Sequence, residues 1–274
     1  MVDASNTSTV QETLARVRLP RFLDGPLGFA ILIAVWQIGA SLSKLPSVLL
    51  PTPGDVAAAL YDLFQTGILY EYTLLSLQHY FVGLAAGVAI GLALGLLISS
   101  NRHVSDVLTP LVNFAYAIVE VAWIPLLILW WGYGPKIIVV AVAYVVASPL
   151  VHNIVVGVRS IPPIYARAVR SLGGGPFVVL QEVTAPAILP SLFNGLRIGA
   201  GFGFRALIFA EMISQAEGIG YLIFSSAASQ QTARTVAGMI VMGTLWLFLD
   251  RVYLRPLERA SVERWGLSNE EGAR

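Results

Sequence analysis

Long apolar runs alternate with short polar stretches along most of the chain, and the lengths of these runs are the first structural signal. A helix that crosses a membrane needs about 20 consecutive, mostly apolar residues. Glycine- and proline-containing stretches divide the runs from one another. The pattern therefore predicts five or six membrane-spanning helices, over residues 27–42, 80–100, 108–131, 137–156, 192–213 and 236–253.

Basic residues gather at alternate connections between these runs. Six spans place four groups on one side: Arg16, Arg18 and Arg21; Arg102 and His103; Arg159, Arg167, Arg170 and Arg197; and Arg251, Arg255, Arg259, Arg264 and Arg274. The other connections carry only Lys44, Lys136 and Arg234. Because cytoplasmic loops carry the excess of Lys and Arg, the arginine-rich side is predicted to be cytoplasmic, with both termini inside.

Composition agrees with a multi-pass membrane protein, since 56% of residues are hydrophobic and 12% are charged, against about 25% charged in soluble domains. The absence of cysteine excludes disulfides, thiolate metal sites and cysteine nucleophiles. No G-x-x-x-x-G-K-[ST] phosphate loop occurs, and His79, His103 and His152 are too scattered to suggest a metal site. The chain is therefore predicted to have no catalytic centre, metal or cofactor of its own.

Two further segments, 51–78 and 216–235, are more than simple turns. In the first, Pro53, Gly54 and Asp55 precede apolar residues at helical spacing, and the second follows a glycine break. Both are predicted to form short helices or re-entrant pieces at the outer face.

Residues 157–191, called here the glycine-turn segment, use far more chain than a connection between two spans requires. A helix is predicted over 161–172, beginning at two prolines and ending at Gly173, because glycine readily adopts the left-handed conformation. A second helix is predicted over 177–183, opened by Pro176 and ended by Pro186. The result is a compact, rigid pair of helices at the cytoplasmic surface.

Three ionisable residues fall inside predicted spans: Glu120, Arg205 and Glu211. Such residues are costly in a membrane and are functional candidates. Arg205 either faces the pore and attracts an anion or forms a structural ion pair. Glu120 is the better partner for that pair, because Glu211 lies on a different face of the helix from Arg205.

Glycines recur every fourth residue in two spans, at Gly83, Gly87, Gly91 and Gly95 and at Gly195, Gly199 and Gly203. Small residues at this spacing let helices approach closely. They are interpreted as packing surfaces, with a contact between two copies of the chain as one location, and flexibility for gating remains the alternative.

The glycine-turn segment resembles the coupling loop of importer-type ABC permeases, whose pattern is E-A-A-x3-G-x9-I-x-L-P. Aligned on Gly173, Ala168 and Pro186 match with the same spacing, Val169 and Val183 are conservative changes, and Arg167 stands where the family has a glutamate. The stretches LPSVLLPTPGDVAAAL, IPLLILWWGYGPK, APAILPSLFNGLRIG and AEMISQAEGIGYLI resemble the aliphatic sulfonate, nitrate and taurine branch of that superfamily. The resemblance covers about residues 27–266.

This resemblance implies an all-α, type I importer permease fold with about six transmembrane helices in a bacterial inner membrane. It implies a cytoplasmic segment at 1–26, a permease domain at 27–256 and a cytoplasmic tail at 257–274. It also implies that the ATPase is contacted by Ala166, Arg167, Ala168, Val169, Arg170, Ser171, Leu172, Gly173, Gly174, Gly175, Val183 and Pro186.

The implied partners are two copies of a cytoplasmic ATP-binding subunit, a second permease (expected to be an identical copy), a periplasmic or lipid-anchored substrate-binding protein and membrane lipid, with no nucleic acid. ATP and Mg²⁺ would be bound by the ATPase, so this chain is not expected to be an enzyme. The implied substrate is a small solute, expected to be an anion such as a sulfonate, taurine, nitrate, bicarbonate or an aromatic acid. The alternative is a gradient-driven secondary transporter or channel, which would act without an ATPase.

Overall fold

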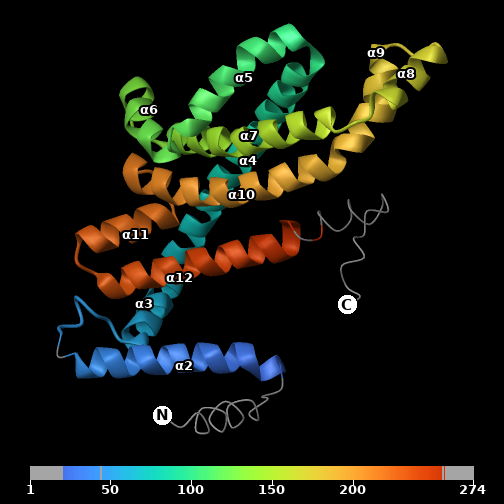
Figure 1. Cartoon of the computed structure of the whole chain (residues 1–274). Coiled ribbons are helices and arrows are strands. Elements are labelled where there is room, and N and C mark those ends of the chain that lie inside the picture. The colour runs from blue at the N-terminus through green and yellow to red at the C-terminus, as the bar shows by residue number, and fades with distance from the viewer. Residues whose placement is uncertain (1–20, 44, 255, 257–274) are drawn as a thin grey trace, which may run out of the picture.

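The structure is a computed structural model that describes residues 21–43, 45–254 and 256. The described part of the chain contains helices and no strands, in the order shown in Figure 1. The helices of the first half are α2 (Arg21–Leu42), α3 (Pro53–Gln65), α4 (Ile68–Ser100), α5 (Arg102–Ala117), η1 (Glu120–Trp123), α6 (Ile124–Trp131) and α7 (Pro135–Arg159). Those of the second half are α8 (Pro163–Ser171), α9 (Pro176–Val179), η2 (Leu180–Thr184), α10 (Ala185–Ser214), α11 (Ile219–Ala228), α12 (Thr232–Leu249) and η3 (Asp250–Leu254).

Four helices are long and apolar enough to cross a membrane: Ile68–Ser100, Pro135–Arg159, Pro176–Ser214 and Thr232–Leu254. A fifth crossing is possible through the bent pair formed by Arg102–Ala117 and Glu120–Trp131. The remaining predicted span, Leu27–Leu42, is a shorter apolar helix within α2. All six apolar runs are thus helical, although two of them are not simple long spans.

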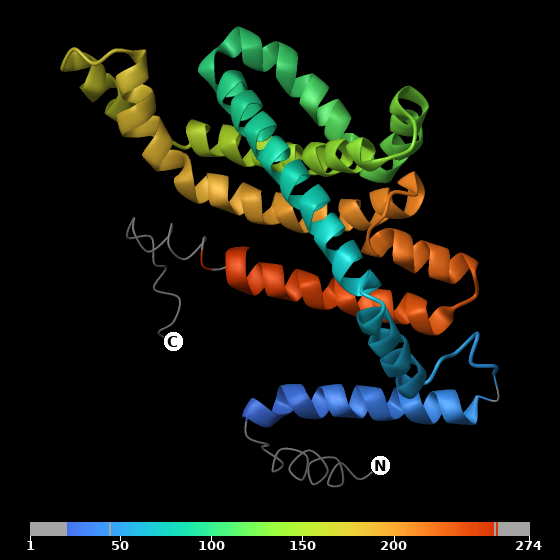
Figure 2. The ribbon, with the colours of Figure 1, turned by 180° about the vertical axis from the view of Figure 1, so that it is seen from behind.

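Helix α7 packs along both α4 and α10 (Figures 1 and 2). Its residues Val142, Val146, Leu150 and Ile154 recur every fourth position and are fully buried. Each of these side chains packs against one glycine of α4, in the same order: Gly83, Gly87, Gly91 and Gly95. A Cβ atom added to any of these glycines would lie 2.6–2.9 Å from the nearest atom of the matching α7 side chain. The α4 glycines are therefore the grooves into which one ridge of α7 fits.

The second glycine series packs against another side of the same helix. A Cβ on Gly199 would lie 2.9 Å from the Val146 carbonyl oxygen, and one on Gly195 would lie 2.9 Å from Asn153 Cβ. Both series are packing surfaces, as predicted, but they close around α7 of their own chain. The suggestion that they form the contact between two permease copies is therefore wrong.

The third predicted span, 108–131, is broken in the middle. Helix α5 ends at Ala117, the backbone is extended at Ile118, and the next helical axis turns by 93°. The Tyr144 hydroxyl of α7 donates to the Ala115 carbonyl and lies 3.5 Å from the Ile118 carbonyl, which supplies partners for groups that the break exposes. Non-helical backbone is tolerated at membrane depth where protein satisfies it in this way.

The predicted outer segment 216–235 contains the short helix α11, and the first half of 51–78 forms α3. The second half of 51–78 is not a separate outer piece, because α4 already begins at Ile68. Helix α3 begins with a capping box in which the Thr52 hydroxyl accepts from the Asp55 N–H and the Asp55 carboxylate accepts from the Thr52 N–H. The bonds from the Thr52 N–H and then from its hydroxyl hold the pKa of Asp55 below its ordinary value. Val56 and Leu63 then bury against Leu222 of α11 and Ala237 of α12.

The predicted N-terminal segment and C-terminal tail lie largely outside the described residues. Residues 21–26 begin α2, and residues 1–20 and 257–274 are not described. Those two predictions therefore stay as predictions.

The glycine groove predicts a sharp difference between two glycine-to-alanine substitutions. In Gly87→Ala the new Cβ would lie 2.7 Å from the Ala143 carbonyl oxygen, which cannot move without displacing α7. We expect a loss of about 1–3 kcal/mol, as for overpacked cores, measured as a lower melting temperature of the purified protein in detergent. Gly243→Ala is the matched control, because nothing lies within 4 Å of its Cβ; equal melting temperatures for the two variants would contradict this account.

Candidate functional site

The glycine-turn segment forms a capped turn between α8 and α9. Helix α8 ends in a Schellman motif, in which the Gly174 N–H donates to the Val169 carbonyl at 3.0 Å and the Gly173 N–H donates to the Arg170 carbonyl at 3.0 Å. Gly173 has φ +86°, the left-handed conformation predicted for it. The turn is therefore fixed by backbone hydrogen bonds and does not depend on long side chains.

Gly174 is required for a different reason. A Cβ atom there would lie 2.6 Å from Val169 Cγ1 and 2.9 Å from the Val169 carbonyl oxygen. Gly175, by contrast, has φ −76° and nothing within 4 Å of an added Cβ. Two of the three glycines thus have structural roles that an L-residue cannot fill without strain.

The second half of the segment differs from its prediction. Helix α9 does not end at Pro186 but continues through the π-helical turn η2 into α10, giving one helical stretch over Pro176–Ser214. In that turn the Ala185 N–H donates to the Leu180 carbonyl, five residues back. The wider turn accommodates Pro186, whose nitrogen carries no hydrogen and whose ring would otherwise meet a carbonyl in the preceding turn.

The tip of the segment extends beyond the spanning helices at one end of the molecule (Figures 1 and 2). Leu172, next to the turn, is 89% exposed, and Ile164, Tyr165 and Phe177 are also exposed. Arg167 and Arg170 are exposed on the same small helix. Large apolar side chains gathered at an exposed tip are typical of a surface that binds another protein.

Glu211, the second candidate feature, is a fully buried carboxylate at the other end of α10. Its Oε2 accepts hydrogen bonds from the Ser76 hydroxyl at 2.9 Å and the Gly220 N–H at 2.8 Å, and its Oε1 lies 3.3 Å from His79 Nδ1. The Ser76 hydroxyl also accepts from the Ile219 N–H at 2.9 Å. The first amides of α11, which have no partners within their own helix, are thereby satisfied by residues of α4 and α10.

This carboxylate explains the glycines that follow it. A Cβ on Gly218 would lie 2.4 Å from the Glu211 carboxyl carbon, and one on Gly220 would lie 2.7 Å from the Ile208 carbonyl oxygen. Sequence reasoning did not connect Ser76 and His79 to Glu211, because more than 130 positions separate them. The sequence offers one clue to these contacts: Gly218 and Gly220 follow shortly after Glu211, an ionisable residue inside a predicted span.

Arg205 and Glu120 do not form the predicted ion pair in the described part of the chain, so that prediction is wrong. Arg205 is exposed and its guanidinium carbon lies 5.2 Å from the centre of the Phe202 ring. Phe202 and Glu120 both line a cavity of about 250 Å³, together with Tyr144 and Ser148. Glu120 lines this cavity beside the break after α5, whereas Arg205 is not among the described residues that line it.

No group of three His, Asp or Glu residues with metal-binding geometry occurs among the described residues.

The buried Glu211 network makes a testable prediction. Glu211→Ala would leave the Ser76 hydroxyl, the Gly220 N–H and the His79 ring without their acceptor. We expect it to destabilise the protein by about 3–5 kcal/mol, as when one partner of a buried charged pair is removed, measured by thermal unfolding in detergent. Glu217→Ala removes an exposed carboxylate from the same connection and should leave the melting temperature unchanged; a similar loss in both variants would show that the network contributes nothing specific.

Comparisons with known proteins bear on the whole arrangement. Residues 87–255 match the family model described as the inner membrane component of binding-protein-dependent transport systems. The taurine transport permease TauC of Escherichia coli is 29% identical over 84% of this chain and 85% of its own length. The riboflavin transport permease RibX of Chloroflexus aurantiacus is 32% identical over 96% and 99%, and the bicarbonate transport permease CmpB of Synechococcus elongatus is 30% identical over 94% and 92%.

The fold has a solved counterpart. An inward-facing structure of the methionine ABC transporter MetNI aligns with a TM-score of 0.54 and 20% identity, covering 69% of this chain and 96% of that one. This likeness concerns the fold alone and agrees with the predicted type I importer permease. Because the family model spans more than half of the chain and the relatives align over most of it, this protein belongs to the inner-membrane permeases of binding-protein-dependent ABC transport systems.

Proposed function

We propose that this chain is the pore-forming permease of an ATP-driven importer and that its glycine-turn segment docks on a cytoplasmic ATPase. The observation that carries the proposal is the Schellman-capped tip, which holds Leu172 almost fully exposed beyond the ends of the spanning helices. An exposed leucine on a rigidly capped turn is suited to insert into a groove of a partner.

The segment is also suited to transmit movement. Because α9, η2 and α10 form one helical stretch, a displacement of the tip would be carried into the packed core as a rigid-body shift. In this proposal, closure of two ATPase subunits moves the tips of two permease copies and switches the pore between inward- and outward-facing states. A binding protein delivers the solute to the outer face, formed by α3, α6 and α11.

The orientation follows from the arginines. Arg102, Arg159, Arg167 and Arg170 lie at the same end of the helices as the tip, so the positive-inside rule makes that end cytoplasmic. Both termini are then cytoplasmic.

The proposed substrate is a small anion. The taurine and bicarbonate relatives are named for solutes that carry an anionic group. The riboflavin relative is named for a different kind of solute, so the relatives do not share one substrate name. Support from this chain comes from Arg205, an exposed cation within the α10 span that has no acidic partner among the described residues. Charged residues inside spans face a water-filled path or another protein.

Coupling is tested by breaking the turn at Gly173. Gly173→Pro demands φ near −65° where the backbone has +86°, and it removes the N–H that donates to Arg170. We expect the tagged chain to insert normally but to lose copurification of its ATPase subunit, and with it ATPase activity stimulated by the binding protein.

Gly175→Ala is the control for this experiment, because φ and the surrounding space at Gly175 suit an alanine. It should retain the ATPase. If Gly173→Pro retains full coupling, or if wild-type chain moves solute in vesicles without any ATPase, the proposal is refuted and the gradient-driven transporter takes its place.

The proposed anionic substrate is tested by substitutions of Arg205. Arg205→Gln should lower the maximal rate of anion import at least about tenfold, as expected for removal of one charged hydrogen-bonding group, while Arg205→Lys retains most of it. Transport assays in vesicles containing the complete complex would measure both. Equal rates in the glutamine and lysine variants would assign Arg205 a role independent of charge.

A further inference from the structure

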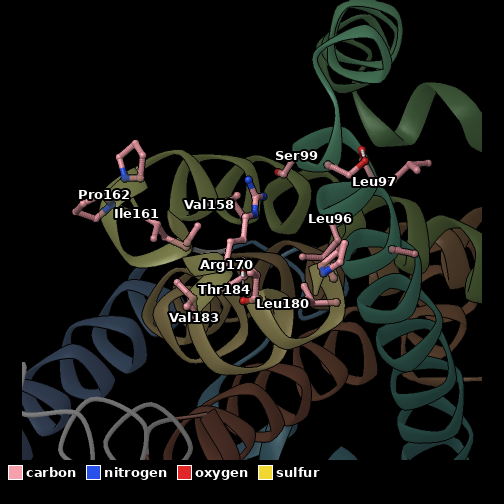
Figure 3. Close-up of a pocket in the computed structure, with 16 residues that line it drawn as sticks. Leu96, Leu97, Ser99, Val158, Ile161, Pro162, Arg170, Leu180, Val183 and Thr184 are labelled. Carbon is pink, nitrogen blue, oxygen red and sulfur yellow. Dashed lines mark hydrogen bonds between the residues drawn. The ribbon is translucent and has the colours of Figure 1, made fainter. Parts of the chain in front are cut away.

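A cavity of about 800 Å³ lies at the root of the glycine-turn segment. Its walls come from the end of α4, the end of α7 and the elements α8, α9 and η2 (Figure 3). Most of its lining is aliphatic, including Leu96, Leu97, Ile161 and Leu180. Among the described residues that line it, Arg170 is the one charged side chain, so the pocket is apolar with a cation.

The apolar part of this pocket opens onto a surface that suits acyl chains. Leu97 continues an exposed stripe of α4 that includes Val82 and Ile90 and lies on a different face from the glycine series. In a chain that crosses a membrane, an exposed apolar stripe of this kind is in contact with hydrocarbon. A tail lying along α4 can therefore enter the pocket without leaving an apolar environment.

The polar part of the pocket offers a cation beside the end of the spanning helix α4. Arg170 extends through the middle of the lining residues in Figure 3. Neighbouring arginines at this end already have partners: Arg102 lies 3.9 Å from Asp106, and Arg159 donates to the Ser105 hydroxyl. Arg170 has no hydrogen-bond or ion-pair partner among the described residues, so its charge is available to an anion.

We propose that this pocket binds an anionic phospholipid of the inner leaflet, with the phosphate on Arg170 and one acyl chain along Leu96 and Leu97. Basic pockets between helices on the cytoplasmic side suit anionic headgroups, and a guanidinium pairs well with phosphate oxygens. Because α4 and α7 form one wall and α8, α9 and η2 the other, the lipid braces the glycine-turn segment against the membrane core. The inference rests on the proposed cytoplasmic orientation of this end of the molecule, but it does not require ATPase coupling.

The test measures lipid binding to the full-length chain in detergent by native mass spectrometry. Phosphatidylglycerol and phosphatidylcholine with the same acyl chains are titrated separately, so that only the headgroup charge differs. We expect tighter binding of phosphatidylglycerol to wild type and about a fivefold loss of that affinity in Arg170→Gln, since one arginine near an anionic surface contributes about 1 kcal/mol and tenfold corresponds to 1.4 kcal/mol. Arg170→Lys should retain part of the preference.

Arg102→Gln is the matched control, because it removes an arginine that is 91% exposed at the same end of α4 but does not line the pocket. It should leave the phosphatidylglycerol affinity unchanged. Equal losses in Arg102→Gln and Arg170→Gln would reduce the effect to general surface charge and overturn the site.

Two further arms separate a lipid from other occupants. Ala93→Trp adds bulk to the apolar part of the pocket from α4, and it should weaken binding of both lipids. Inorganic phosphate at the same concentration should not compete; if it does, the ligand is a free anion and the acyl-chain site is refuted. If the bound ATPase expels phosphatidylglycerol completely from wild type, the pocket is a protein-docking surface and the proposal fails.

Discussion

Close contact between backbones around α7 is the constraint on which the rest of the structure depends. A membrane offers no hydrophobic driving force between helices, so association depends on tight packing and hydrogen bonds. Glycines of α4 and α10 admit the ridge of Val142, Val146 and Leu150 from two sides. Because both neighbours are held by the same helix, their relative positions are fixed.

The two ends of α10 are secured differently. At one end, Glu211 joins α4, α10 and α11 through a buried network of hydrogen bonds, which is strong but depends on every partner being present. At the other end, the Schellman turn between α8 and α9 uses only backbone groups, so the side chains of α8 are not needed to hold it. In the proposed orientation, this division leaves the cytoplasmic surface able to meet a partner while the outer segments keep one arrangement.

The sequence predicted the elements well where a local signal exists. Run length located the apolar helices, and the glycines at 173–175 predicted the turn with its left-handed residue, because backbone conformation there is a property of a few neighbouring residues. Contacts between distant positions could not be obtained in this way. The partners of Glu211, the location of both glycine faces against α7 and the failure of the Arg205–Glu120 pair depend on how helices are placed in space. Proline misled the local reading at Pro186, because a π-helical turn can absorb a proline that an α-helical turn cannot.

The continuous stretch over Pro176–Ser214 connects these features into one mechanical element. Its 39 residues correspond to about 58 Å at 1.5 Å per residue, well beyond the roughly 30 Å of hydrocarbon in a bilayer. Along it lie the exposed Phe177 near the tip, the glycine face against α7, the exposed Arg205 and finally Glu211. This stretch contains the π-helical turn η2 and Pro190, and its ribbon bends between α9 and α10 in Figure 1, but its middle is held against α7 by the glycine face. In the proposed function, movement of the tip would be transmitted through this held middle towards Arg205, Glu211 and α11.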